Sequence, residues 1–347
     1  MPSFMLGIAF YEYQALTDCS KRMNIFVNMA AFCEPHLAFT LDSLFRTAAQ
    51  PEKIHVGLVD QSLDNTGGWL YQRPYAGQVH HLQIDPIQSR GVSWARHISQ
   101  TLYQGESYYL QVDSHTLFRK GWDDAMRGLL LNLEQRLPKP IISCYPPGFE
   151  FKENGEVKIT EFSPGQVFFS IPEKPDALSP QSATLTFKTD LIDNADIIPG
   201  YHLSGGFIFC RGRFVEEVPY DPFMYFHGEE QNLSLRAYTR GWTITHIRSD
   251  WIPVFHLYKQ AGNVSTSHHW HPEYEAQRKR KWTELQIAAD RRLIALIRGE
   301  LPGSWGLGTQ RSLQDFIALS GLDYGRYLSR QPNTISRGCS IANDSQP

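Results

Sequence analysis

Apolar and polar positions follow two different periods in the first third of the chain. Residues 25–32 (IFVNMAAF) form a continuous apolar run typical of a buried strand, and residues 36–49 place apolar side chains at helical spacing. Three more strand patterns and one more helical pattern follow, at residues 53–61, 79–85 and 107–118 and at residues 93–103. Strands that alternate with helices across short connections predict an α/β fold with a mostly parallel sheet flanked by helices.

The pattern changes after residue 145. Residues 146–159 predict a β-hairpin, and residues 170–183, rich in proline and serine and without periodicity, predict a long loop. Regular structure resumes near residue 202. Residues 274–299 then predict one long amphipathic helix, with the basic run 278–281 on its solvated face.

These changes divide the chain into four parts. We expect an N-terminal extension (1–20), a main α/β domain (21–270), a C-terminal helical segment (271–330) and a disordered tail (331–347).

Composition excludes several classes of protein. The 347 residues are 41% hydrophobic and 20% charged with a net charge of −3, which indicates a globular chain and no nucleic-acid partner. The five cysteines are scattered without a CxxC pair, which argues against a disulfide framework and a thiolate zinc site. The start of the chain lacks the basic stretch of a signal peptide, and no apolar run is long enough to span a membrane. We therefore expect a cytoplasmic protein.

The main candidate for chemistry is Asp113-Ser114-His115, directly after the apolar run 108–112. Ligands of parallel α/β sheets bind at the carboxyl ends of the strands, where Asn28 and Asp60 also lie. In an extended strand, residues two apart point to the same side, so Asp113 and His115 are expected to present two ligands to one metal ion. The tripeptide alone also fits a polar strand end, but its position after a buried strand favours the metal site.

Two further groups of residues bear on this site. Glu229 and Glu230 stand where a helix is expected to begin; carboxylates there can cap the helix or bind hydroxyl groups of a sugar or an acceptor. His256 ends the apolar run 251–255 and can either supply a third metal ligand or make a structural hydrogen bond.

Taken together, these motifs resemble the GT-A glycosyltransferases. Three features occur in an order similar to that of the polypeptide N-acetylgalactosaminyltransferases: the DSH motif, the segment HGEEQNLSLR and the late His256. Residues 25–61, 89–124, 227–242 and 306–324 resemble more closely the cytoplasmic N-acetylglucosaminyltransferases that modify a hydroxyproline of the ubiquitin-ligase subunit Skp1. The chain differs from the polypeptide N-acetylgalactosaminyltransferases in two respects. His227-Gly228 stands where that family has Trp-Gly-Gly, and no lectin-like domain follows.

The resemblance implies a role for each motif. It makes Asp113, His115 and His256 the ligands of Mn²⁺ or Mg²⁺, and Glu229 and Glu230 the residues that face sugar and acceptor. It also implies that a UDP-sugar donor, with N-acetylglucosamine as the sugar, is bound by the following residues: Val27, Asn28, Ala30, Asp60, Arg90, Arg96, Gly205 and Gly206.

The implied reaction retains the anomeric configuration and transfers the sugar to a hydroxyl, on a protein or on a glycan. No carboxylate stands out as a covalent nucleophile, so we favour front-side attack, with the leaving phosphate taking the acceptor proton.

Three alternatives remain open. The acceptor can be a capsule or lipopolysaccharide sugar, or the chain can be a binding protein without turnover. A metal-dependent hydrolase using His268, His269 and His271 is disfavoured, because the cluster lacks an acidic partner at helical spacing and fits surface polar residues better.

Overall fold

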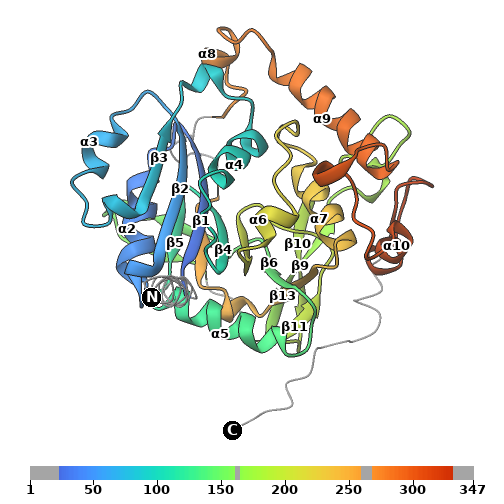
Figure 1. Ribbon diagram of the computed structural model, residues 1–347, viewed down its shortest axis with the longest axis horizontal. Coiled ribbons are helices and arrows are strands. Elements are labelled where there is room, and N and C mark those ends of the chain that lie inside the picture. Colours follow the sequence, from blue (N-terminus) through green and yellow to red (C-terminus); the bar gives the residue numbers. More distant parts are fainter. Residues whose placement is uncertain (1–22, 161–164, 259–267, 331–347) are drawn as a thin grey trace, which may run out of the picture.

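A mixed eight-stranded sheet forms the centre of the molecule (Figure 1). The computed structural model describes residues 23–160, 165–258 and 268–330. The strand order is β11-β13-β6-β12-β4-β1-β2-β3. The strands are β1 (Ile25–Phe32), β2 (Ile54–Gln61), β3 (Val79–Gln83), β4 (Tyr108–Asp113), β6 (Pro140–Ser143), β11 (Ile197–Pro199), β12 (Phe207–Arg211) and β13 (Thr243–Ile247).

Most neighbours in this sheet run parallel. β1 pairs in parallel with β2 and with β4, β2 with β3, and β13 with β6, whereas β12 and β11 are antiparallel to their partners. The helices are α2 (Leu37–Thr47), α3 (Thr66–Leu70), α4 (Val92–Gln100), α5 (Trp122–Glu134), α6 (Phe214–Glu217), α7 (Glu229–Thr239), α8 (Pro272–Glu275), α9 (Trp282–Ile297) and α10 (Leu313–Ser320). The predicted α/β class, with a mostly parallel sheet flanked by helices, is confirmed.

The alternation of side chains along β1 explains why both faces of the sheet are covered. Ile25, Val27 and Met29 are buried in one core with side chains of α2 and α5. Phe26, which points the other way, is buried in a second core with side chains of α6 and α7. A strand buried on both faces reads as a continuous apolar run, which is the pattern that predicted β1.

The segment after β6 contains more strands than the sequence indicated. The predicted hairpin is confirmed by β7 (Phe149–Phe151) and β8 (Val157–Ile159). The predicted loop 170–183 is partly wrong, because β9 (Gln166–Pro172) extends into it and pairs antiparallel with β10 (Phe187–Asp193). The β10 sequence FKTDLID is mostly exposed, so it lacks the apolar run that predicts a buried strand.

The single long helix predicted at residues 274–299 is wrong. The chain forms α8, leaves the helical conformation, and begins α9 only at Trp282. Arg278, expected on a solvated face, is 3% exposed and donates hydrogen bonds to the carbonyl oxygens of His269 and Pro86. These tertiary contacts, which no local pattern encodes, hold residues 276–281 out of a helix.

The C-terminal helices share a core with the helix that carries the two glutamates. α9 and α10 lie beside α7 (Figure 1). Leu285, Ala289 and Leu293 of α9 and Phe316 of α10 are buried with Leu235 of α7. The guanidinium of Arg236, also on α7, donates to the carbonyl oxygens of Ser304 and Pro219 and to the side chain of Asn232. α7 is therefore held from the side of the C-terminal segment.

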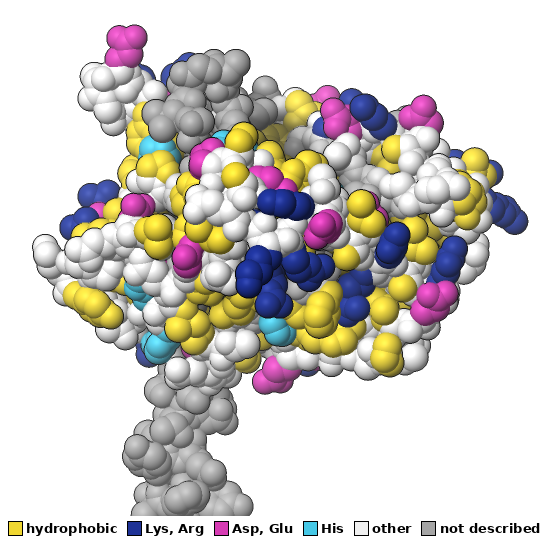
Figure 2. All heavy atoms as spheres, turned by 90° about the horizontal axis from the view of Figure 1, so that it is seen from above, with side chains coloured by type: hydrophobic (Ala, Val, Ile, Leu, Met, Phe, Trp, Pro, Cys, Tyr) yellow, Lys and Arg dark blue, Asp and Glu magenta, His cyan; other side chains and the backbone are white. Residues whose placement is uncertain are grey.

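The surface seen from above mixes acidic, basic and apolar side chains, with a group of Lys and Arg near its centre (Figure 2). No helix in the described part of the chain combines the length and hydrophobicity that a membrane crossing requires. The predicted extension 1–20 and tail 331–347, together with Cys19 and Cys339, lie outside the described residues.

The contacts of Arg236 predict a loss of stability in Arg236→Lys. A lysine ammonium lacks the planar fork with which the guanidinium reaches Ser304, Pro219 and Asn232 from one position, so a fully buried charge loses hydrogen-bond partners. We expect the free energy of unfolding to fall by about 2–4 kcal/mol, measured by urea denaturation. Arg298→Lys, at an exposed position after α9, is the matched control and should change little; equal stabilities of the two variants would contradict the assignment.

Candidate active site

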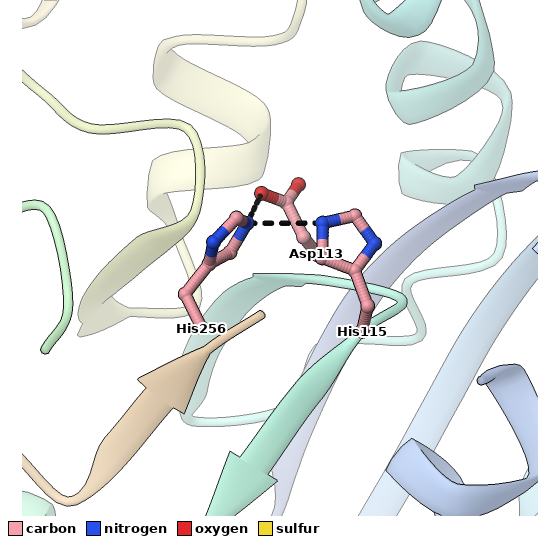
Figure 3. A group of neighbouring side chains, drawn as sticks. All are labelled: Asp113, His115 and His256. Atoms are coloured by element: carbon pink, nitrogen blue, oxygen red, sulfur yellow. Dashed lines mark hydrogen bonds and ion pairs between the residues drawn. The ribbon is translucent and has the colours of Figure 1, made fainter. Parts of the chain in front are cut away.

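Three side chains from two neighbouring turns converge on one point (Figure 3). Asp113 ends β4, His115 lies just before β5 (Thr116–Phe118), and His256 ends β14 (Val254–His256). β14 pairs antiparallel with β5, which places His256 beside Thr116. The Nε2 atom of His256 lies 3.0 Å from Nε2 of His115 and 3.1 Å from Oδ2 of Asp113.

The reason for this convergence differs from the predicted one. Asp113 and His115 do not share a face of one extended strand, because β4 ends at Asp113 and the chain bends at residues 114–115. The hydroxyl of Thr116 donates to the Asp113 carbonyl at 2.8 Å and closes the bend. A turn, rather than strand periodicity, brings the two side chains together.

The geometry of the three residues fits a divalent cation. In octahedral coordination with bonds of about 2.1 Å, adjacent ligand atoms are about 3.0 Å apart, close to the separations of the ring nitrogens and the carboxylate oxygen here. Nδ1 of His115 lies 2.8 Å from Oε2 of Glu34. A carboxylate in this position fixes the tautomer that directs the Nε2 lone pair of a histidine toward a metal.

Arg96 of α4 joins Asp113 to the glutamates of α7. Its guanidinium is buried and donates to Oδ1 of Asp113 at 2.7 Å, to Oε1 of Glu229 at 2.6 Å and to the carbonyl oxygen of Gly205 at 2.9 Å. Burial alone would raise the pKa of Asp113, but the hydrogen bond with His256 and the charge of Arg96 outweigh it and hold that pKa well below its usual range. The second oxygen of Asp113 is left facing the histidines.

The two glutamates at the start of α7 have different surroundings. The Glu229 side chain is 8% exposed and, besides Arg96, accepts a hydrogen bond from the hydroxyl of Ser93. Burial raises the pKa of Glu229 to about 7 despite the charge of Arg96. The Glu230 side chain is 25% exposed, and hydrogen bonds from His202, Gly205 and Tyr145 outweigh the effect of burial and lower its pKa.

Two cavities meet at Asp113 and His256, and His115 borders the second of them. The first, of about 310 Å³, is bordered by both glutamates, Gly205 and Gly206. The second, of about 290 Å³, is bordered mainly by aromatic and small polar side chains: Ala30, Phe32, Gln61, Ser89, Tyr225, His269 and Trp270. Asp113, His256, Val92 and Phe226 border both cavities. A ligand with two dissimilar ends joined by an anionic link matches this arrangement.

The structure brings some of the other predicted binding residues to these cavities and leaves others away from them. Ala30 borders the second cavity, and Arg96, Gly205 and Gly206 border the first. A Cβ atom on Gly205 would lie 2.5 Å from Nη1 of Arg96, so only glycine fits beside that guanidinium.

Four of the predicted residues border neither cavity. The side chains of Val27 and Asn28 are fully buried in the middle of the central strand β1. Asp60 is buried 3.5 Å from His81, and Arg90 is exposed beside the ring of Trp94. Their assignment to the donor remains a prediction.

A family model described as Glycosyltransferase (GlcNAc) matches residues 24–72 and 69–326. The chain belongs to this glycosyltransferase family. Solved structures give weaker likenesses. S. aureus TarS 1–349 has a TM-score of 0.42 and 16% identity, over 68% of this chain and 60% of that one. GalNAc-T7 with UDP, GalNAc and Mn²⁺ has a TM-score of 0.46 and 14% identity, over 85% and 54%.

This glycosyltransferase thus spans less than two thirds of the length of either solved chain. A search of curated protein sequences finds no match.

Several residues that border the cavities of this glycosyltransferase were missed in the sequence. Tyr145 follows the apolar strand β6, and His202 precedes the Ser204-Gly205-Gly206 segment, so strand-end position and proximity to the glycines were the available signals. The expectation that the histidine cluster 268–271 lies on the surface is wrong for His269. This side chain is 8% exposed, with hydrogen bonds to Tyr225 and Ser89.

The pKa of Glu229 predicts a specific pH dependence of stability. A folded-state pKa raised from 4.5 to about 7 stabilises the protein below pH 4.5, and this contribution is lost as the pH rises through 7. Without metal, Glu229→Gln should therefore gain stability relative to wild type by up to about 3 kcal/mol between pH 4.5 and 7. Denaturant unfolding at several pH values measures this difference.

The control is Glu284→Gln, a substitution at an exposed position in the first turn of α9. Its stability should run parallel to wild type across the same pH range. A parallel curve for Glu229→Gln as well would refute the raised pKa.

Proposed function

We propose that this glycosyltransferase uses a divalent cation to transfer N-acetylglucosamine from UDP-N-acetylglucosamine to an acceptor hydroxyl. The observation that carries the proposal is the convergence of Asp113, His115 and His256 where the two cavities meet. The sugar is taken from the description of the matching family, which names GlcNAc.

The two cavities suit the two ends of such a donor. The second cavity offers the rings of Phe32, Tyr225 and Trp270, on which a flat base can pack, and the amide of Gln61. The first cavity offers carboxylates and glycine backbone, which suit the hydroxyl groups of a sugar. The diphosphate then lies between them, beside the converging residues.

Mn²⁺ or Mg²⁺ bound by Asp113, His115 and His256 would supply positive charge to the leaving diphosphate. Arg96 keeps Asp113 ionised and oriented, and Glu34 orients His115. Glu229 and Glu230 begin α7 on the sugar side of the site. Since both glutamates already have hydrogen-bond partners within the protein, we keep to front-side attack with retention, in which no carboxylate acts as nucleophile.

For the acceptor, we propose a protein hydroxyl, such as the hydroxyproline suggested by the resemblance to the Skp1-modifying enzymes. A cell-surface polysaccharide would require the same donor chemistry and is the second candidate. A binding protein without turnover is the third. All three candidate ligand positions carry side chains that can bind a metal, and Asp113 is ionised. Both observations support an enzyme over a binding protein.

The release of UDP from UDP-N-acetylglucosamine tests the proposal without knowledge of the acceptor. Wild type should release UDP slowly with Mn²⁺ and not with EDTA. Asp113→Asn and His115→Ala should reduce the rate at least about 100-fold, because each removes one of three metal ligands and the ion then no longer offsets charge on the diphosphate. Parallel assays with GDP-mannose test the base.

His80→Ala, on the edge strand β3, is the control histidine and should retain the wild-type rate. Metal-independent release, or full activity in both ligand variants, would contradict the metal assignment. Binding of UDP-N-acetylglucosamine without any turnover would favour the binding-protein alternative, and equal use of GDP-mannose would contradict the uridine assignment.

A further inference from the structure

Glu230 is held by three donors from three different segments. Its Oε1 accepts from the backbone N–H of Gly205 at 2.6 Å, and its Oε2 accepts from the hydroxyl of Tyr145 at 2.8 Å. Nε2 of His202 lies 3.2 Å from the same Oε2 and 3.2 Å from the Tyr145 hydroxyl oxygen. An ionised carboxylate can accept about four hydrogen bonds, so one position remains available.

Of the two supporting side chains, His202 is held by a further packing contact. The ring of His202 stacks on Phe187 with a centroid separation of 3.6 Å and an interplanar angle of 16°, and its side chain is 2% exposed. Tyr145 follows directly after β6 and the buried Cys144. His202 cannot leave Glu230 without breaking its stack on Phe187.

Exposure separates the two glutamates. Glu229 is 8% exposed and its carboxylate is engaged by Arg96 and Ser93, so it braces α4 against α7. The Glu230 side chain is 25% exposed and borders the first cavity. The available position of Glu230 therefore faces a space that a ligand can occupy.

The Gly205 peptide connects Glu230 to the metal side of the site. Its N–H donates to Glu230, and its carbonyl oxygen accepts from Arg96, which in turn holds Asp113. The cavity that Glu230 borders is also bordered by Asp113 and His256. In the proposed donor complex, this cavity would receive the sugar attached to the diphosphate.

We propose that Tyr145 and His202 are positioning residues that hold the Glu230 carboxylate ionised and aimed into the first cavity, where it accepts a hydrogen bond from a hydroxyl of the donor pyranose. Glu229 instead braces the site without touching the sugar. This assignment rests on the proposed function. It divides the roles of two adjacent carboxylates that the sequence presents as a pair.

Binding of UDP and of UDP-N-acetylglucosamine, both with Mn²⁺, separates the sugar contact from the nucleotide contacts. Isothermal titration calorimetry should give Tyr145→Phe, His202→Gln and Glu230→Gln an unchanged Kd for UDP. The ratio of the Kd for UDP-N-acetylglucosamine to that for UDP should rise about tenfold in each variant, since a hydrogen bond to a charged group is lost or misdirected.

Tyr103→Phe is the matched control, because its hydroxyl donates to the carbonyl oxygen of Glu106 and it borders neither cavity. Its ratio should equal that of wild type. Unchanged ratios in all three site variants, or an equal loss of affinity for both ligands, would overturn the inference while leaving the proposed function intact. A wild-type protein that binds neither ligand would instead refute the proposed function.

Discussion

The buried guanidinium of Arg96 is the interaction on which the rest of the site depends. It lies between two carboxylates, Asp113 at the end of β4 and Glu229 at the start of α7, and it also binds the Gly205 carbonyl oxygen. Without a cation between them, the largely buried Glu229 and the partly buried Asp113 would repel each other and resist ionisation. Together with the hydrogen bond from His256, Arg96 keeps Asp113 ionised, and it joins the end of β4 to the start of α7.

The positions of Arg96 and Asp113 explain why residues 205 and 206 are both glycines. A side chain at Gly205 would meet the guanidinium, and a Cβ atom at Gly206 would lie 3.1 Å from Oδ2 of Asp113. On the far side, the contacts of Arg236 and the core shared with α9 and α10 hold α7 in place. The C-terminal segment thus contributes to the site without supplying any of the three converging residues, because it fixes the helix from which Glu229 and Glu230 extend.

Local sequence predicted the parts of this molecule that local forces determine. β1, α2, β2, α4 and β4 were predicted within a few residues, since a strand buried on both faces and an amphipathic helix each leave a clear apolar pattern. The strand β10 and the break before α9 escaped prediction, because an exposed pairing and the buried Arg278 depend on distant partners.

The same distinction applies to the site. The three residues Asp113, His115 and His256 were predicted together and the structure places them together, but through a bend and the β5–β14 pairing rather than through strand alternation. The contacts of Arg96 with two carboxylates could not be predicted, since its partners lie 17 and 133 residues away in the chain. Tyr145 and His202 carry no motif and become visible only through their contacts with Glu230.

The most direct test of this account is the coordination of Mn²⁺ in the presence of UDP, measured by pulsed electron paramagnetic resonance. The account predicts couplings to two histidine nitrogens, one of which disappears in His115→Ala and the other in His256→Ala. A spectrum with no histidine nitrogen coupling, or one that neither substitution changes, would contradict the claim that Asp113, His115 and His256 form the metal site.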